Sequence, residues 1–181
     1  MRNLNLYLLT TLGALAGHLP ARLISLLLAT GLGWTLAQSG LDRLQLLAQQ
    51  RYGQPASETV TSWRHMLEES RALPDDEKLK AVNQFFNRRI RFNADQAVWG
   101  MPDYWATPLE FMGRSQGDCE DFAILKMQML RAAGVDAERM KLVLLRDLAA
   151  NADHAFLLVQ TDAGKLVLDN VTDRLYDGRR A

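Results

Sequence analysis

The sequence predicts an α+β fold, in which helices come first along the chain and an antiparallel sheet follows. Two observations support this class. Between residues 41 and 133, apolar residues recur at the three- and four-residue spacing of amphipathic helices. From residue 140 onward, short apolar segments separated by turn-forming residues are typical of strands that pair with their sequence neighbours. Helices followed by an antiparallel sheet is the order of α+β domains.

The composition fits one globular domain with a real core and excludes several classes of function. The chain has 181 residues, of which 48% are hydrophobic and 23% charged. Lys and Arg number 21, as do Asp and Glu, and no long run of like charge occurs, so nothing favours a nucleic-acid partner. The single cysteine cannot form an internal disulfide and excludes a multi-cysteine zinc or iron–sulfur site.

The first 37 residues have the pattern of a leader. Two apolar runs, residues 4–16 and 23–36, each follow an arginine, and small residues precede a cleavage position after Ala37. The second run is shorter than the roughly 20 apolar residues that a membrane-spanning helix needs. We therefore expect residues 1–37 to be a signal peptide or an N-terminal anchor, with export from a bacterial cytoplasm, and residues 38–181 to form the domain. The alternative interpretation is that part of this segment forms a helix of the folded core.

Three helices are expected before the middle of the domain. Residues 41–52 carry an apolar helical stripe, and the stretch GQPAS at residues 53–57 interrupts it. Residues 58–73 have the pattern of a second helix. Pro74 and the acidic residues after it begin a third, because proline and carboxylates are favoured in the first turn of a helix.

Residues 93–117 are expected to form a long loop, since they are rich in Gly, Pro and aromatic residues. Only residues 108–112 have the pattern of a helical turn. Loops of this length inside a compact domain are usually functional. Trp99 and Trp105 either shape a groove or pack the loop onto the core, and the sequence does not separate these two interpretations.

The second half of the domain is predicted to be one helix followed by strands. The helix extends from about Cys119 to Ala133 and ends at Gly134. A turn at residues 162–164 joins the last two strands as a hairpin. The predicted strands cover residues 140–146, 154–161 and 165–171.

Three residues at the ends of these elements suggest nucleophilic catalysis. Cys119 starts the helix, where the helix dipole favours a thiolate and its backbone N–H can stabilise an oxyanion. His154 starts one strand and Asp169 ends the next, so the hairpin brings both to one end of the sheet. A thiol, a base and a group that orients the base are what cysteine catalysis needs. A buried cysteine, a structural histidine and a turn aspartate are the alternative.

Four segments resemble the bacterial transglutaminase-like cysteine proteinases of the LapG type: DYWATPLEF, GDCEDFAILK, HAFLLV and LVLDN. The resemblance extends from about Leu73 to Val171, and GDCED with the upstream WATPLE is its most specific part. It implies a papain-like or transglutaminase-like core, in which the helix carrying the nucleophile packs on the antiparallel sheet. It also implies that Cys119, His154 and Asp169 form a catalytic triad.

The resemblance further implies a calcium-dependent periplasmic cysteine endopeptidase. Its expected substrate is a large cell-surface adhesin, cleaved near the adhesin's N-terminus, which releases the cell from a biofilm. Its expected regulator is an inner-membrane cyclic-di-GMP receptor that sequesters the protease.

Two alternatives remain open: acyl transfer to an amine, as in transglutaminases, or a binding module without activity. The chain ends at Ala181, soon after Asp169, where members of the family usually continue, so a final packing element or part of a substrate groove is in doubt.

Three carboxylates, Asp118, Glu120 and Asp121, flank the cysteine, and as bare anions they would raise the pKa of its thiol. In one interpretation they cap the helix, with Asp118 at the N-cap and Asp121 at the third helical position. In the other they bind Ca²⁺, which would neutralise the cluster and fix the start of the helix. The resemblance favours calcium. The choice of further ligands among Asp95, Asp103 and backbone carbonyls stays open.

Overall fold

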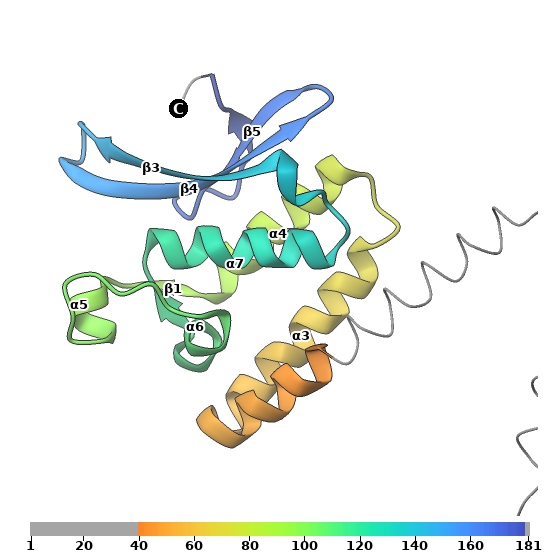
Figure 1. Cartoon of the computed structure of the whole chain (residues 1–181), viewed down its shortest axis with the longest axis vertical. Helices are drawn as coiled ribbons and strands as arrows, with labels where there is room; N and C mark the ends of the chain where they lie inside the picture. Colours follow the sequence, from red (N-terminus) through yellow and green to blue (C-terminus); the bar gives the residue numbers. More distant parts are fainter. Residues whose placement is uncertain (1–39, 180–181) are drawn as a thin grey trace, which may run out of the picture. The chain divides into compact units, whose positions relative to one another are not determined.

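The computed structural model describes residues 40–179, in which the helices precede the sheet along the chain, as predicted for an α+β fold (Figure 1). The leader predicted at residues 1–37 lies outside the described residues. None of the helices within residues 40–179 is long and apolar enough to span a bilayer. The helical segments are residues 40–52, α3 (Gln54–Ser70), α4 (Asp75–Arg89), α5 (Asp95–Val98), α6 (Pro108–Arg114), α7 (Cys119–Ala132) and the 3-10 turn η1 (Ala137–Arg139).

The sheet has four antiparallel strands in the order β3–β4–β5–β6, so each strand pairs with its neighbour in sequence. These strands are β3 (Met140–Asp147), β4 (Ala152–Thr161), β5 (Gly164–Leu168) and β6 (Tyr176–Asp177). Helix α7 packs directly against β4, and α4 packs against α7 (Figure 1). A separate parallel pair joins β1 (Arg91–Phe92) to β2 (Gln116–Gly117).

The core lies where α3, α4, α6, α7 and the sheet meet. Trp63 and Phe86 pack edge to face there, with ring centroids 5.0 Å apart. Each fully buried large side chain stabilises the fold by about 1.5–3 kcal/mol relative to exposure. Such packing holds α7 on β4, which fixes the start of α7 beside the start of β4. Other fully buried core residues are Val60, Leu79, Val82, Phe111, Met112, Leu125, Leu130, Leu157 and Leu168.

The segment at residues 93–117 is more regular than a loop, contrary to the sequence expectation. It contains α5, α6 and β2. Helix α6 begins with a capping box: the Thr107 side chain accepts a hydrogen bond from the Glu110 N–H at 3.4 Å, and the Glu110 carboxylate accepts one from the Thr107 N–H at 2.9 Å. With Pro108 in the first turn, this T-P-x-E pattern was readable as a helix start.

Several helix and strand boundaries also differ from those predicted from the sequence. The first helical break is Gly53 alone, with a positive φ of 79°, because Pro55 is tolerated in the first turn of α3. Helix α3 ends at Ser70 instead of residue 73, and β5 ends at Leu168 instead of residue 171. Strand β6 was not expected, since two residues are too short to show an alternating pattern.

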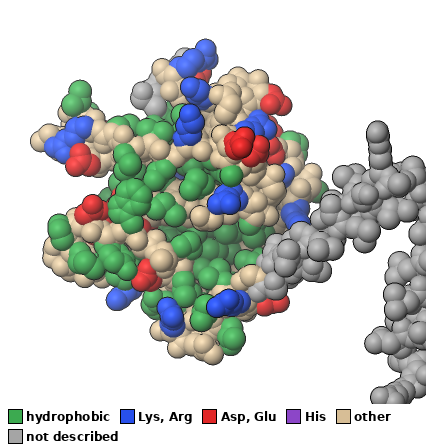
Figure 2. Space-filling view, in the orientation of Figure 1, with side chains coloured by type: hydrophobic (Ala, Val, Ile, Leu, Met, Phe, Trp, Pro, Cys, Tyr) green, Lys and Arg blue, Asp and Glu red, His purple; other side chains and the backbone are tan. Residues whose placement is uncertain are grey.

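Opposite charges are mixed over the face of the molecule in Figure 2. Lys, Arg, Asp and Glu side chains are scattered there around hydrophobic side chains, and no continuous basic surface occurs on this face. This distribution agrees with the balanced composition and gives no support to nucleic-acid binding.

Candidate active site

Cys119 is the first residue of α7 and faces the start of β4. The backbone N–H of Ala155 lies against its sulfur. Gly117 lets the chain enter the helix here, because a Cβ at this position would lie 2.4 Å from both Asp121 Oδ2 and the Phe111 ring. A side chain at residue 117 would therefore displace one of these groups.

His154 and Asp169 are in contact, an arrangement that the predicted hairpin allows without fixing the strand register. The His154 Nε2 atom lies 3.1 Å from each carboxylate oxygen of Asp169, which is 3% exposed. Asp169 also accepts hydrogen bonds from the Tyr176 hydroxyl at 2.9 Å and from the Val171 N–H at 3.2 Å. Because the carboxylate accepts, Nε2 is the donor, and Nδ1 is the ring nitrogen left to accept a proton.

Cys119 and His154 line two neighbouring cavities together. A cavity of about 810 Å³ has an apolar wall that includes Phe92 and Phe156, and it also reaches Asp169. The second, of about 570 Å³, is bordered by Trp105 and by acidic side chains. The thiol and the imidazole therefore border the same open space, where one substrate could reach both.

The two tryptophans of the 93–117 segment have different surroundings. Trp105 is 48% exposed and lines the acidic cavity, which favours the groove interpretation. Trp99 packs against the core, with its ring centroid 4.7 Å from that of Tyr104 and the Arg114 guanidinium over it, which favours the packing interpretation.

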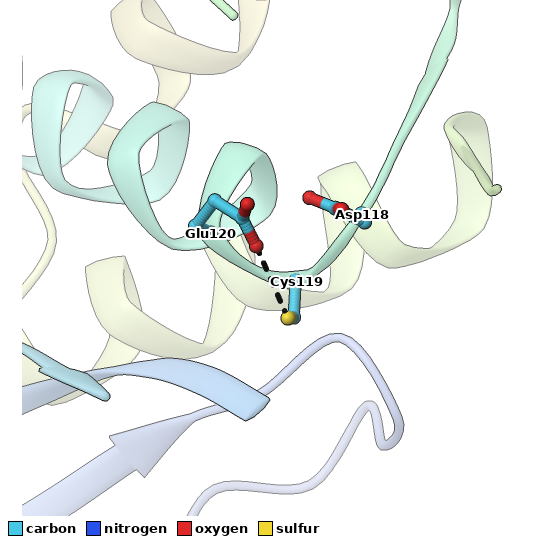
Figure 3. Close-up of side chains that lie close together, drawn as sticks. All are labelled: Asp118, Cys119 and Glu120. Carbon is cyan, nitrogen blue, oxygen red and sulfur yellow. Dashed lines mark hydrogen bonds between the residues drawn. The ribbon is translucent and has the colours of Figure 1, made fainter. Parts of the chain in front are cut away.

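Two of the three predicted ligands, Asp118 and Asp121, come together with Asp95, whereas Glu120 belongs to a different group of acidic side chains. Asp95, Asp118 and Asp121 each place a carboxylate oxygen within 4.8 Å of the others, and Asp95 forms a second such group with Asp103 and Glu120. Asp95 lies in α5, in a segment without periodicity, so the sequence left it as one of several ligand choices. Figure 3 shows Asp118 and Glu120 on either side of Cys119 at the start of α7.

The capping interpretation fails for Asp118. It occupies the N-cap position of α7, but its side chain makes no capping hydrogen bond. Asp121 accepts a hydrogen bond from the Ala106 N–H at 2.8 Å through Oδ1. Three buried carboxylate oxygens of this cluster have no hydrogen-bond partner among the described residues: Asp95 Oδ1, Asp118 Oδ1 and Asp121 Oδ2. Each such group costs about 1–3 kcal/mol, which a cation among them would offset.

Burial and mutual repulsion make this cluster poor at holding negative charge. Burial, followed by the neighbouring Glu120, raises the pKa of Asp118 to about 8. Burial also raises the pKa of Asp121 to about 7. The Cys119 thiol donates to Glu120 Oε2 at 3.3 Å (Figure 3). Burial together with that carboxylate raises the pKa of the thiol to about 12. Without added positive charge, the thiol is therefore a weak nucleophile, as the sequence indicated.

Comparisons with known proteins agree with this geometry. The model of the family described as bacterial transglutaminase-like cysteine proteinase matches residues 52–180. The solved structure of Legionella pneumophila LapG is similar, with 29% identity over 77% of each chain and a TM-score of 0.67. The EGTA-treated form of L. pneumophila LapG is 29% identical, covers 77% of this chain and 75% of the LapG chain, and has a TM-score of 0.67. The calcium-bound form is 30% identical, covers 77% of each chain, and has the same TM-score of 0.67. No curated protein matches the chain significantly.

Proposed function

Because this chain belongs to the bacterial transglutaminase-like cysteine proteinases, we propose that Cys119, His154 and Asp169 are its catalytic triad. Membership of the family makes the protein a cysteine proteinase, which acts on protein substrates. The observation that carries the triad is the contact of His154 Nε2 with both Asp169 oxygens at 3.1 Å, beside cavities that Cys119 also lines.

The proposed reaction uses each of these residues in turn. His154 Nδ1 accepts the thiol proton, and the Cys119 sulfur attacks the scissile carbonyl carbon. The peptide C–N bond then breaks as the imidazolium gives its proton to the leaving amine. Water hydrolyses the resulting thioester, with His154 again as the base. Asp169 holds the ring so that Nδ1 faces the thiol throughout.

The start of α7 supplies the complementary charge for this reaction. The backbone N–H of Cys119 is one of the donors that a helix leaves without an internal partner. Such a donor stabilises the oxyanion that forms on the carbonyl, and removing one donor of this kind typically costs about 100- to 1,000-fold in rate. The helix dipole also favours a thiolate at residue 119.

The acidic cluster fits a calcium ion. Its donors are carboxylate oxygens, the ligand type that Ca²⁺ prefers, and three of them are buried and unpartnered. Asp95, Asp118 and Asp121 would hold the ion, with Glu120 adjoining. When bound, the ion supplies the positive charge that offsets the carboxylates around the thiol. One of the similar structures is the calcium-bound form of L. pneumophila LapG, which supports this assignment.

Stability of the protein in a calcium chelator is expected to fall as pH rises from about 4 to 8. Asp118 and Asp121 have ordinary pKa values of 3.8, and in the fold these rise to about 8 and about 7. The folded state therefore binds more protons than the unfolded state across this window, and the free energy of unfolding decreases with pH. Urea denaturation at several pH values in EGTA measures this slope.

Two comparisons isolate the cause of that slope. Asp118→Asn removes one titrating group, so its unfolding free energy should depend less on pH. Adding calcium in place of EGTA should flatten or reverse the slope, because the ion favours the ionised carboxylates. A chelated wild-type protein that gains stability between about pH 4 and 8 would contradict the raised pKa values.

The substrate, location and regulator are proposed from the family resemblance. We propose cleavage of a large cell-surface adhesin near its N-terminus, in the periplasm, controlling release from a biofilm. An inner-membrane cyclic-di-GMP receptor would sequester the protease. The leader pattern at residues 1–37 supports export, and the shared cavities beside Cys119 suit an extended segment of a protein substrate.

The proposed function is tested by mixing the protein, in calcium, with the N-terminal region of a candidate adhesin from the same bacterium. One discrete cleavage, located by mass spectrometry of the fragments, is the expected result. A parallel reaction contains a glutamine donor and a labelled amine. Incorporation of the amine without cleavage would identify a transglutaminase instead, and neither product with an otherwise folded protein would favour the inactive binding module.

A further inference from the structure

Lys126 is fully buried within α7, two helical turns beyond Cys119 and on the same face of the helix. Its Nζ atom has no hydrogen-bond partner among the described residues, and the Phe122 ring centroid lies 5.5 Å away. A buried ammonium is costly without a compensating charge, and burial lowers the pKa of this lysine to about 7. Negatively charged groups near Lys126 are therefore needed to compensate for its burial.

Two carboxylates raise the pKa of Lys126 against the effect of burial, Asp169 more than Asp173. Asp173 already has a cationic partner, because its carboxylate accepts a hydrogen bond from Arg88 at 2.8 Å. Asp169 has no Lys or Arg in ion-pair contact within residues 40–179. Lys126 is also outside ion-pair contact with Asp169, so its charge acts on that carboxylate across a longer distance inside the buried region.

Helix α4 holds the chain segment that follows β5. The Asn87 amide donates to the Asp169 and Thr172 carbonyls, both at 2.8 Å, and the Asn83 amide donates to the Thr172 carbonyl at 2.9 Å. The amide oxygens of Asn83, Asn87 and Asn170 are buried without a partner in this part of the chain. Helix α4 also packs on α7, the helix that carries the unpartnered Lys126.

We propose that Lys126 is a positioning residue for the triad, whose buried ammonium balances Asp169 and so maintains the carboxylate that accepts the Nε2–H of His154. The proposal rests on the catalytic role proposed above for Asp169. Without the ammonium, the buried Asp169 carboxylate would keep only its hydrogen-bond donors, which are His154 Nε2, the Tyr176 hydroxyl and the Val171 N–H. A carboxylate stabilised less well would hold His154 less firmly as the base for the thiol.

The first experiment measures the coupling directly, without a substrate. The pKa of Lys126 is followed by ¹³C NMR of its side chain in the wild-type protein and in the Asp169→Asn and Asp173→Asn variants. Asp169→Asn should lower this pKa by about 1, since a countercharge is lost, and Asp173→Asn should lower it less. An unchanged Lys126 pKa in Asp169→Asn would overturn the proposal.

The second experiment asks whether Lys126 acts through Asp169. The rate of Cys119 alkylation by iodoacetamide at neutral pH, in calcium, is compared for Lys126→Met, Asp169→Asn and the double variant. Lys126→Met keeps the length of the side chain and removes its charge. It should slow alkylation about tenfold alone, but no more than about twofold when Asp169→Asn is already present. The exposed Lys141→Met is the matched control and should alkylate like the wild type.

The outcomes separate this proposal from the proposed function. If Asp169→Asn slows alkylation and Lys126→Met adds an equal loss in both backgrounds, Lys126 acts only on the fold and its positioning role is overturned. If Asp169→Asn changes neither alkylation nor cleavage, the triad itself is overturned. Should circular dichroism show that Lys126→Met is unfolded, the NMR measurement on Asp169→Asn decides, because it leaves the lysine in place.

Discussion

Replacing Cys119 with alanine is expected to abolish cleavage and to leave the fold intact. The change removes one sulfur atom, which is the only proposed nucleophile, and loss of a nucleophile typically lowers kcat by about 10⁴-fold or more. The thiol is only partly buried and lies among carboxylates that disfavour its ionisation. Its loss should therefore change the free energy of unfolding by no more than about 1 kcal/mol. Cleavage of the adhesin fragment and thermal unfolding measure the two effects.

A matched truncation shows whether the loss is specific. Ser62→Ala also removes a single atom, in this case a hydroxyl on α3 that bonds only to the helix backbone at Glu58. This control should cleave at the wild-type rate. If Cys119→Ala still cuts the substrate, a different nucleophile is at work and the proposed triad is wrong.

The fold class and the contact of His154 with Asp169 were predictable because local signals set them. The periodicity of residues 119–133 gives α7, and the turn at residues 162–164 gives the hairpin that brings His154 to Asp169. Cys119 lies at the first position of α7 as expected. Each of these features depends on neighbours in sequence, which a single chain displays.

The rest of the site depends on contacts between residues distant in sequence. Asp95 reaches the acidic cluster only because the 93–117 segment folds into short elements, and Tyr176 reaches Asp169 from a two-residue strand. Lys126 occupies a helical position that the sequence predicts, but its burial follows from packing of α7 between β4 and α4. The pattern of hydrophobic residues does not identify this position as buried, because the residue there is charged.

Asp121→Asn is expected to weaken calcium binding strongly and, with it, to lower the reactivity of Cys119. The substitution keeps the size of the side chain, and its oxygen can still accept the Ala106 N–H, but it removes the charge at the buried, unpartnered Oδ2 position. Loss of one carboxylate ligand from an oxygen-only site should weaken calcium affinity by about 100-fold or more. Isothermal titration calorimetry measures the affinity, and iodoacetamide alkylation measures the thiol.

The size of the reactivity change follows from the thiol pKa. In the metal-free site this pKa is about 12, whereas an ordinary cysteine has a pKa of about 8.5. Each pKa unit changes the thiolate fraction tenfold, so an ion that restores the ordinary value would speed alkylation about a thousandfold. EGTA should therefore slow wild-type alkylation strongly, whereas Asp121→Asn should alkylate slowly with or without calcium.

A control substitution of an acidic residue outside the site shows whether the loss of calcium binding and thiol reactivity depends on the position of the charge. Asp162 is fully exposed in the turn at the far end of β4 from His154, so Asp162→Asn should bind calcium and alkylate like the wild type. Wild-type alkylation that is equally fast in EGTA and in calcium would mean that the thiol ionises without help from a cation. The carboxylates around Cys119 would then serve only the fold, and the unpartnered oxygens of Asp95, Asp118 and Asp121 would need a different explanation.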